Sequence, residues 1–455
     1  MALTDHDPFL QEQMGNPVGS MERFTFDLQG HELIDPVDPT AYVSRIDRVA
    51  PVTMDGTPVP DNVEVFEAQV RDPFIEADPE GYRRVTEYVD GMSQVIRSYG
   101  FDPLDERKKD KDQAYQHPYI GRDEVSHGDE LNNNIFTNAW LRHPKVAALK
   151  AWHSLIPSAR ALSKLMNPQV GDVIANKAGE EFVSTAEVAA HFRFVADAIG
   201  VRERAAVMQA IAESHLESVA KKQPNISWLS LASGTAEPSI NAAKSISDRG
   251  LAEVDLTVVD YDPKSLKMVK QNAAAKNFTG SVTTEFGNIL SPTVSADLKA
   301  KTDHPEGFEV VEVLGFEEYL PQDGEEKGNF KDIGLMQASD FTRQAFDLVK
   351  PGGVLITGNM IYDRPQKDFV FGVVNWEVIN ARTEEADLHV LDEAGILADP
   401  NARVSIFRVI DDQTGLHVYD ILKVEKLPVV PEVTDNEPVL RQRVARKSGK
   451  VAIAA

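Results

Sequence analysis

The chain has 455 residues, no cysteine and a formal net charge of −25. The lack of cysteine excludes disulfides, thiolate nucleophiles and cysteine-zinc sites. The negative charge argues against a nucleic-acid partner, because phosphate binding needs clustered Lys and Arg. No signal peptide and no run of about eighteen apolar residues is present, so the sequence predicts a cytoplasmic protein without a membrane span.

The N-terminal half divides into two predicted regions. Residues 1–60 are rich in Pro, Asp and Gly, and we expect an irregular arm. Residues 61–225 are expected to be mainly helical. A strand at Val63–Gln69 is followed by helices at Asp78–Tyr99, from the capping box at Ser184 to Gly200, and at Val201–Lys222.

From Ile226 the pattern alternates between strands and helices, which indicates a parallel sheet. The expected strands are Trp228–Ala232, Leu256–Asp260, Ser281–Phe286, Phe308–Leu314, Val354–Asn359, Val404–Ile410 and His417–Val424. Helices fit at Glu237–Gly250, Pro263–Lys276, Ile333–Val349 and around Phe369–Asn380. A hairpin turn at Asp411–Gly415 makes the last strand antiparallel to its neighbour. The predicted class is therefore α/β, with a Rossmann-like domain over 226–426 and a disordered basic tail over 427–455.

The turn after the first of these strands is the most informative segment. It reads Ala232-Ser233-Gly234-Thr235-Ala236-Glu237, with one glycine and an acid at the helix start. Three glycines would favour a dinucleotide pyrophosphate, whereas one glycine beside a carboxylate suits a ligand without phosphates. The next strand ends in Asp260, whose carboxylate can accept hydrogen bonds from both ribose hydroxyls.

Taken with the later segments, this order resembles class I S-adenosylmethionine-dependent methyltransferases. The resemblance covers Ile226 to Val424 and includes the turn Lys350-Pro351-Gly352-Gly353. Segments at 229–234, 314–320, 358–359 and 376–383, with 201–204 before them, are similar to the bacterial family of 3-hydroxypalmitic acid methyl ester biosynthesis. The resemblance implies S-adenosylmethionine as the cofactor and a small-molecule or lipid-like acceptor.

Two positions depart from the family pattern. Relatives usually have Gly and Cys where Ala232 and Ser233 stand, and alanine permits close ligand approach if its φ is negative. The third strand is followed by Gly287-Asn288 where many relatives have Asp, and the Asn side-chain oxygen can still accept from the adenine amino group.

The resemblance also implies a set of site residues. The cofactor-binding candidates are Ala232, Ser233, Gly234, Ala236, Glu237, Asp260, Tyr261, Asp262, Asn288, Ile289, Leu314 and Gly315. Candidates for contact with the acceptor are Tyr319, Asn359 and Arg382, the last as a bidentate partner if the acceptor is a carboxylate. The histidines show no metal-ligand spacing, so no metal is predicted.

Methyl transfer is an in-line displacement that needs mainly alignment of donor and acceptor. A carboxylate acceptor needs no general base, whereas a hydroxyl does, and no histidine lies near the ends of the fourth and fifth strands. This favours O-methylation of a carboxylate or an easily deprotonated hydroxyl. Two alternatives remain open: transfer of the aminocarboxypropyl group, as in nicotianamine-synthase-type enzymes, and a non-catalytic interaction protein.

Overall fold

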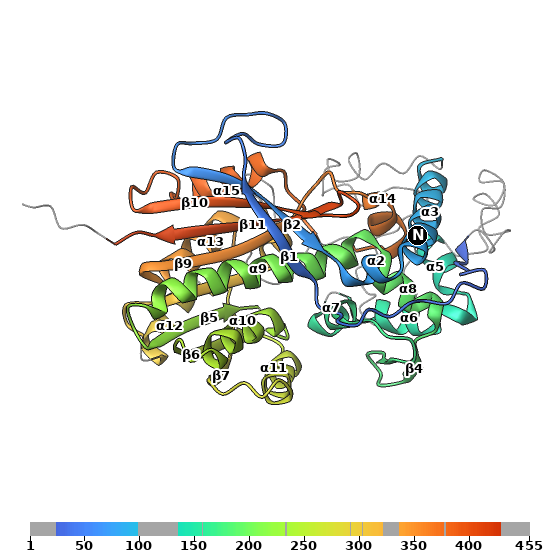
Figure 1. Ribbon diagram of the computed structural model, residues 1–455, viewed down its shortest axis with the longest axis horizontal. Coiled ribbons are helices and arrows are strands. Elements are labelled where there is room, and N and C mark those ends of the chain that lie inside the picture. Colours follow the sequence, from blue (N-terminus) through green and yellow to red (C-terminus); the bar gives the residue numbers. More distant parts are fainter. Residues whose placement is uncertain are drawn as a thin grey trace, which may run out of the picture.

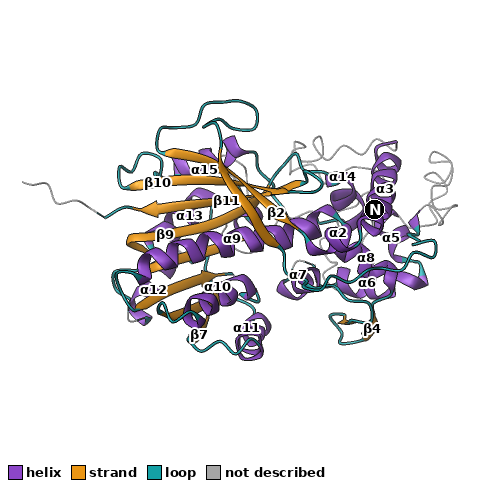
Figure 2. Cartoon of the chain, viewed as in Figure 1, coloured by secondary structure: helices purple, strands orange, loops and turns teal. Residues whose placement is uncertain are grey.

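A nine-stranded sheet forms the centre of the computed structural model, which describes residues 24–98, 135–156, 158–232, 234–291, 293–302, 304–321, 336–376 and 379–428 (Figures 1 and 2). The strands are β1 (Tyr42–Arg48), β2 (Val63–Arg71), β5 (Asn225–Leu231), β6 (Glu253–Asp260), β7 (Ser281–Phe286), β8 (Phe308–Leu314), β9 (Val349–Met360), β10 (Ala402–Asp411) and β11 (His417–Lys426). A separate hairpin joins β3 (Val173–Ala175) and β4 (Glu181–Val183). The predicted basic tail, apart from its first two residues, lies outside the described residues.

Seven strands run in the order β7-β6-β5-β8-β9-β11-β10. Strands β5 to β9 pair in parallel, and β11 is antiparallel to both β9 and β10. The predicted α/β class and the antiparallel last strand are thus confirmed. Nearly every residue of β5 and β8 is buried, as expected for parallel strands covered by helices on both faces.

The sheet has nine strands rather than the expected seven, because β2 and β1 extend it beyond β10. Strand β2 pairs in parallel with β10, and β1 pairs antiparallel with β2. The Phe66 and Phe407 rings stack at 4.9 Å across the first of these pairs. The segment expected to be irregular therefore contains β1, and the region expected to be mainly helical supplies β2, which covers an edge that β10 would otherwise expose.

Helices cover both faces of the sheet. They are α2 (Pro73–Ala77), α3 (Pro79–Ser98), α5 (Ile135–Leu141), η2 (Pro144–Val146), α6 (Ala147–His153), α7 (Ala159–Met166), α8 (Ala186–Phe194), α9 (Ala196–Ala220), α10 (Glu237–Asp248), α11 (Pro263–Ala275), α12 (Val294–Lys301), η3 (Glu317–Tyr319), α13 (Ala338–Asp347), α14 (Lys367–Phe369), η4 (Val370–Val374) and α15 (Glu384–Glu393). One apolar core contains residues of α9, α10 and the N-terminal helices, and a second contains residues of α13 and α15. Helices α3, α5, α6 and α8 gather beyond one end of the sheet (Figure 1).

The sequence predicted that Gly200 ends a helix, and this prediction is wrong. Helix α8 ends at Phe194, and Gly200 lies inside α9. A Cβ atom at Gly200 would lie 2.6 Å from the side chain of Val418 on β11. The glycine therefore serves close packing of α9 on the sheet, at a cost of about 0.5–1 kcal/mol in helix stability.

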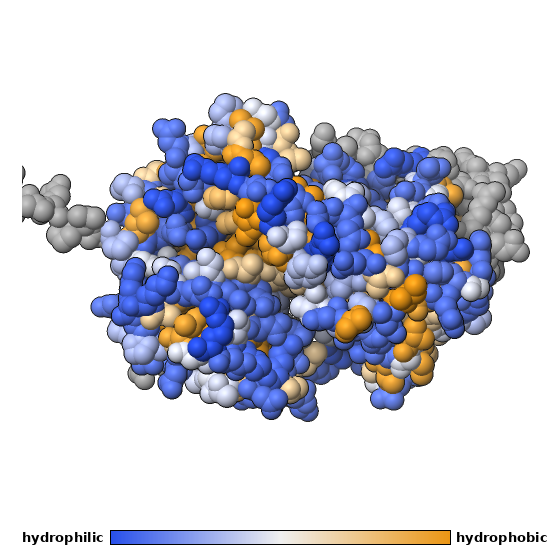
Figure 3. All heavy atoms as spheres, viewed as in Figure 1, coloured by the Kyte–Doolittle hydropathy of each residue, from blue (hydrophilic) through white to orange (hydrophobic). Residues whose placement is uncertain are grey.

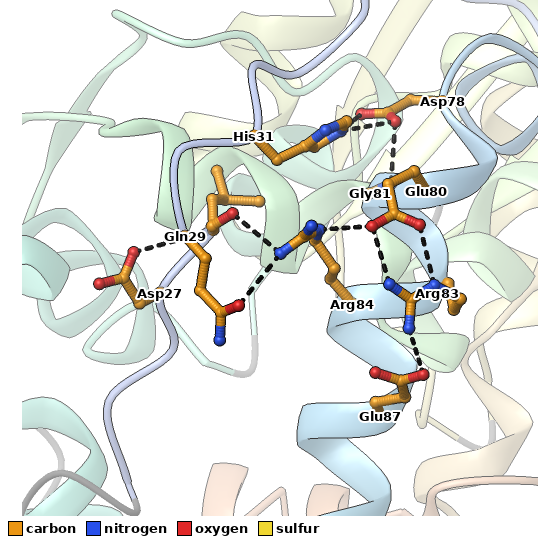
Figure 4. A network of polar contacts seen from close by, with 10 residues as sticks. Asp27, Gln29, His31, Asp78, Glu80, Gly81, Arg83, Arg84 and Glu87 are labelled. Atoms are coloured by element: carbon orange, nitrogen blue, oxygen red, sulfur yellow. Dashed lines mark hydrogen bonds and ion pairs between the residues drawn. The ribbon is translucent and has the colours of Figure 1, made fainter.

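The described part of the N-terminal arm is fastened to α3 by polar contacts (Figure 4). His31 Nε2 lies 2.8 Å from Asp78 Oδ1, and Arg84 donates to the Leu28 carbonyl at 3.3 Å. Asp78 also accepts from the Gly81 amide at 2.8 Å, in the first turn of α3. These contacts fix the path of the arm toward β1.

The outer surface in the view of Figure 3 is mostly hydrophilic, in keeping with the charge of −25. Apolar atoms gather where the β3–β4 hairpin lies, and Val170, Val173 and Val183 are exposed there. No helix of the described residues is long and apolar enough to cross a membrane.

Candidate functional site

The turn after β5 has an unusual backbone. Ala232, Gly234 and Ala236 have φ of 50°, 57° and 49°, and Ser233 lies outside the described residues. Ala232 thus does not meet the condition of a negative φ, under which alanine permits close ligand approach. Left-handed alanines cost of order 1–2 kcal/mol each. Such strain typically persists where the surrounding structure holds a functional turn in place.

Glu237 is the first residue of α10, directly after this turn. Its carboxylate forms an ion pair with Lys276 Nζ at 2.9 Å. Both side chains are partly exposed, so solvent weakens the pair. Glu237 therefore lies at the start of the helix, as the sequence predicted, and its carboxylate is already paired with Lys276.

Asp260 ends β6 and connects the turn after β5 to the segment after β6. Its Oδ2 accepts from the Gly234 amide at 3.2 Å, and its Oδ1 accepts from the Asp262 amide at 2.7 Å. Burial raises the pKa of Asp260, while these backbone donors act in the opposite direction. The carboxylate is thus held in one orientation at the carboxyl edge of the sheet, beside the turn after β5.

The side chain of Asp262 has a structural task. It caps α11 by accepting from the Lys264 amide at 2.9 Å and from the Ser265 hydroxyl at 3.1 Å. Asn288 similarly accepts from the Leu290 amide at 3.0 Å, and Ile289 is buried in the core beside α12. These three predicted residues lie at the correct edge of the sheet, and the contacts of their side chains are local.

An exposed aromatic pair stands next to Asp260. Tyr261 is 70% exposed and Phe286, at the end of β7, is 58% exposed. Their ring centroids are 5.4 Å apart at an interplanar angle of 30°. Phe286 was not among the predicted site residues. Its place at the end of the strand that follows the Asp260 strand in the sequence could have indicated it. Two large exposed rings at this edge form a surface on which a flat heterocycle can stack.

At the end of β8, Gly315 has a φ of 75° and lies against Arg204 of α9. The preceding residue, Leu314, donates its amide to Glu312 Oε1 at 3.0 Å. The other Glu312 oxygen accepts from the hydroxyls of Ser230 and Ser239, so this buried acid ties β8 to β5 and α10. Glu312 and Arg204 were missed as members of the site. The presence of an acid within the apolar run of β8 could have indicated Glu312.

We expect Gly315→Ala to destabilise the protein more than the same change at Gly395. A Cβ at Gly315 would lie 2.3 Å from Arg204 Nη1, whereas nothing lies within 4 Å of one at Gly395, which has a similar φ of 69°. Both variants carry the backbone strain of about 1–2 kcal/mol, and only the first displaces a buried guanidinium. Thermal unfolding of the two variants measures the difference, and equal shifts in melting temperature would contradict the assigned contact.

The acceptor candidates Asn359 and Arg382 are brought together beside β9. Arg382 is buried and donates to Asn359 Oδ1 at 3.3 Å and to the carbonyls of Glu317 and Leu320 at 2.9 and 3.0 Å. These bonds use the two Nη atoms of the guanidinium, while its buried Nε has no hydrogen-bond partner among the described residues. Tyr319 lies in η3, the short helix whose Glu317 carbonyl accepts from Arg382, and burial raises the pKa of the Tyr319 hydroxyl.

An apolar cavity of about 40 Å³ lies among the helices beyond the sheet. Trp140, Trp152, Phe192 and Phe369 line it, together with Asp197 of α9. Its volume is well below that of the roughly 150 Å³ cavity that holds a benzene ring. Within the described ranges, no group of three or more His, Cys, Asp or Glu side chains is arranged to hold a metal ion.

No family model matches the chain, and no curated protein is similar to it in sequence. Solved structures with some likeness include a possible exported protein from Bordetella parapertussis, at 17% identity and a TM-score of 0.44, covering 62% of this chain and 87% of that one. A methyltransferase domain of the citrinin polyketide synthase has 14% identity and a TM-score of 0.36, with coverages of 66% and 71%.

A third solved structure is an S-adenosylmethionine-dependent methyltransferase from Geobacter sulfurreducens in complex with S-adenosyl-L-homocysteine. It has 12% identity and a TM-score of 0.31, and the match covers 48% of this chain and 90% of that one. At this level of likeness, what these proteins bind says nothing about this chain. Its function has to be argued from its own side chains.

Proposed function

We propose that this chain is an S-adenosylmethionine-dependent methyltransferase that O-methylates a small-molecule or lipid-like acceptor. The observation that carries the proposal is the placement of Asp260. Its carboxylate ends β6 and accepts from backbone amides on both sides, one of them in the left-handed turn after β5. A carboxylate fixed at this edge of a parallel sheet suits the two hydroxyls of a ribose.

The neighbouring residues fit the other parts of S-adenosylmethionine. The exposed rings of Tyr261 and Phe286 suit the adenine base. The turn at Gly234 brings backbone amides toward the methionine end, with Glu237 and its partner Lys276 close to the ammonium and carboxylate groups. The proposed cofactor site is completed by the backbone of Ala232, Ala236, Asn288 and Gly315. Ser233 remains a cofactor-binding candidate because it belongs to the turn after β5.

The proposed chemistry is displacement at the sulfonium methyl group. The protein aligns the methyl donor with the acceptor, which can lower the activation barrier by about 7–11 kcal/mol. Leu314 ends β8, the strand beside β5, and Gly315 follows it, so we place the acceptor next to these two residues. Arg382 stays a candidate for contact with the acceptor. Its two Nη atoms donate to Asn359 and two carbonyls, while its buried Nε has no partner among the described residues.

We expect S-adenosylmethionine and S-adenosylhomocysteine to bind with micromolar affinity and to raise the melting temperature. A ligand at one hundred times its Kd stabilises a protein by about 2.7 kcal/mol. Isothermal calorimetry and thermal shift assays measure both effects. The absence of heat and of any shift at millimolar ligand would refute the proposal.

The products distinguish the two kinds of transfer. Methyl transfer releases S-adenosylhomocysteine, whereas aminocarboxypropyl transfer releases methylthioadenosine. Incubation of the protein and labelled cofactor with a cell extract, followed by mass spectrometry, identifies the product. Methylthioadenosine as the enzyme-dependent product would replace methylation by the alternative transfer, and cofactor binding without any product would favour an interaction protein.

A further inference from the structure

A buried carboxyl group with a free oxygen lies just beyond the end of β8. Glu318 is 2% exposed, and its Oε2 has no hydrogen-bond partner among the described residues. Its Oε1 lies 3.7 Å from Arg204 Nη1, beyond hydrogen-bond distance. The position of Glu318 is fixed by the backbone, because its carbonyl accepts from the Asn380 amide at 2.5 Å.

The adjacent acid provides a contrast. Both carboxylate oxygens of Glu317 accept from hydroxyl groups, one from Thr342 and the other from Thr357 at 2.8 Å. Glu317 is therefore satisfied within the protein and ties η3 to α13 and β9. Glu318 is equally buried, yet retains acceptor capacity that no described side chain uses.

The surroundings of Glu318 place it beside the proposed acceptor position. Glu318 Oε1 and Gly315 both lie close to Arg204 Nη1, at 3.7 Å for the carboxylate oxygen and at 2.3 Å for a Cβ placed on the glycine. Behind it, the same guanidinium lies 4.4 Å from the centre of the Tyr419 ring. Glu318 and the end of β8 thus contact one buried cation.

Charged groups from several elements act on Glu318. Burial raises its pKa to about 7. The cations Arg204 on α9 and Arg364 after β9 and a hydrogen bond from the Met360 backbone lower this pKa, and Asp197 on α9 raises it. The charge of Glu318 in turn raises the pKa of Tyr319 and of Tyr419. A carboxyl group in this range exists in both protonation states near neutral pH, as a general base requires.

We propose that Glu318 is the general base of the reaction and that the acceptor is a hydroxyl compound rather than a carboxylate. This inference rests on the proposed methyltransferase function. The acceptor O–H bond breaks as its proton passes to Glu318 Oε2, and the oxygen forms a bond to the methyl carbon. The carbon–sulfur bond breaks with its electron pair on sulfur, and the proton later passes to solvent. A carboxylate acceptor needs no base and would meet a second carboxylate here.

The first test needs no acceptor. Infrared difference spectra of the full-length protein, recorded between about pH 6 and pH 8, report the C=O band of protonated carboxyl groups. We expect a band that is lost with rising pH in the wild type and in E317Q, and that is missing from E318Q. Identical spectra in the wild type and E318Q would show that Glu318 does not titrate in this range and would overturn its role as a base.

The second test identifies the acceptor class. The protein is incubated with methyl-labelled S-adenosylmethionine and a cell extract, and the products are treated with alkali, which releases methanol from esters but not from ethers. We expect alkali-stable label, with E318Q slower by about 10²–10⁴-fold and E317Q close to the wild type. The rate should rise with pH through neutrality in the wild type only.

The outcomes separate the two proposals. Label released by alkali, or an E318Q rate equal to the wild type, overturns the base and the hydroxyl acceptor while leaving a methyltransferase. A wild-type protein that binds no cofactor, or that binds it and transfers no label, counts against the methyltransferase itself. Calorimetry with S-adenosylhomocysteine on E318Q is the control, with an affinity within a few-fold of the wild type expected.

Discussion

Asp260→Ala is expected to weaken binding of S-adenosylmethionine by about ten- to hundredfold without unfolding the protein. Hydrogen bonds from two ribose hydroxyls to a charged acceptor contribute about 1.5–3 kcal/mol, and each 1.4 kcal/mol corresponds to about tenfold in Kd. The substitution also removes the acceptor of the Gly234 amide, so the turn after β5 loses one of its fixed contacts. Isothermal calorimetry with the wild type and the variant measures the loss.

Asp255→Ala is the matched control for this change. Asp255 lies on the same strand but nearer its amino end, and it is exposed. Removing its carboxylate alters the net charge in the same way without touching the site. We expect its Kd to equal that of the wild type, and equal Kd values for both variants would show that Asp260 does not bind the ribose.

The strands of the central sheet and their parallel direction were accessible from the sequence, because each parallel strand there is a short apolar run next to a helix. The extension by β2 was not. Val63–Gln69 was predicted as a strand, yet its partner β10 follows more than three hundred residues later, and Val404 pairs with Val63. Local periodicity carries no information about such a distant pairing.

The site was predicted in part, and the reasons differ between residues. Asp260 and Gly234 were recognised because each closes or follows a strand with a clear apolar pattern. Arg204 and Glu318 lie 3.7 Å apart because the tertiary structure brings α9 to the end of β8, and their spacing in the sequence does not indicate this contact. Conversely, Arg382 was predicted as an acceptor ligand from its charge, but its hydrogen bonds to backbone carbonyls depend on the path of the chain after β8.

A buried arginine joins α9 to the N-terminal helices. Arg202 donates to Asp72 Oδ2 at 2.6 Å and to the carbonyls of Leu165 and Phe192 at 2.9 Å, with a further bond to the Arg193 carbonyl at 2.5 Å. Its side chain is 1% exposed and that of Asp72 is fully buried. The same Asp72 caps α2 by accepting from the Phe74 amide at 2.9 Å. One guanidinium thus connects α2, α7, α8 and α9.

We expect Arg202→Met to lower the free energy of unfolding by about 3–5 kcal/mol, the cost of leaving one partner of a buried ion pair uncompensated. Burial already raises the pKa of Asp72, and Arg202 is the main group that lowers it. Without Arg202, folding favours the protonated form of Asp72, so the variant should be least stable above the raised pKa and should recover stability as the pH falls below it toward the ordinary pKa of an aspartate. Urea unfolding at several pH values measures both effects.

The double variant Arg202→Met with Asp72→Asn separates charge from packing. Asparagine keeps an acceptor for the Phe74 amide and carries no charge, so the double variant should regain part of the stability lost by Arg202→Met, through a coupling between the two positions. It should also lose the steep pH dependence of the single variant. If Arg202→Met alone stayed within about 1 kcal/mol of the wild type, the ion pair would not hold α9 to the N-terminal helices. The position of Arg204 beside Gly315 would then depend on packing of α9 against β11 and α10.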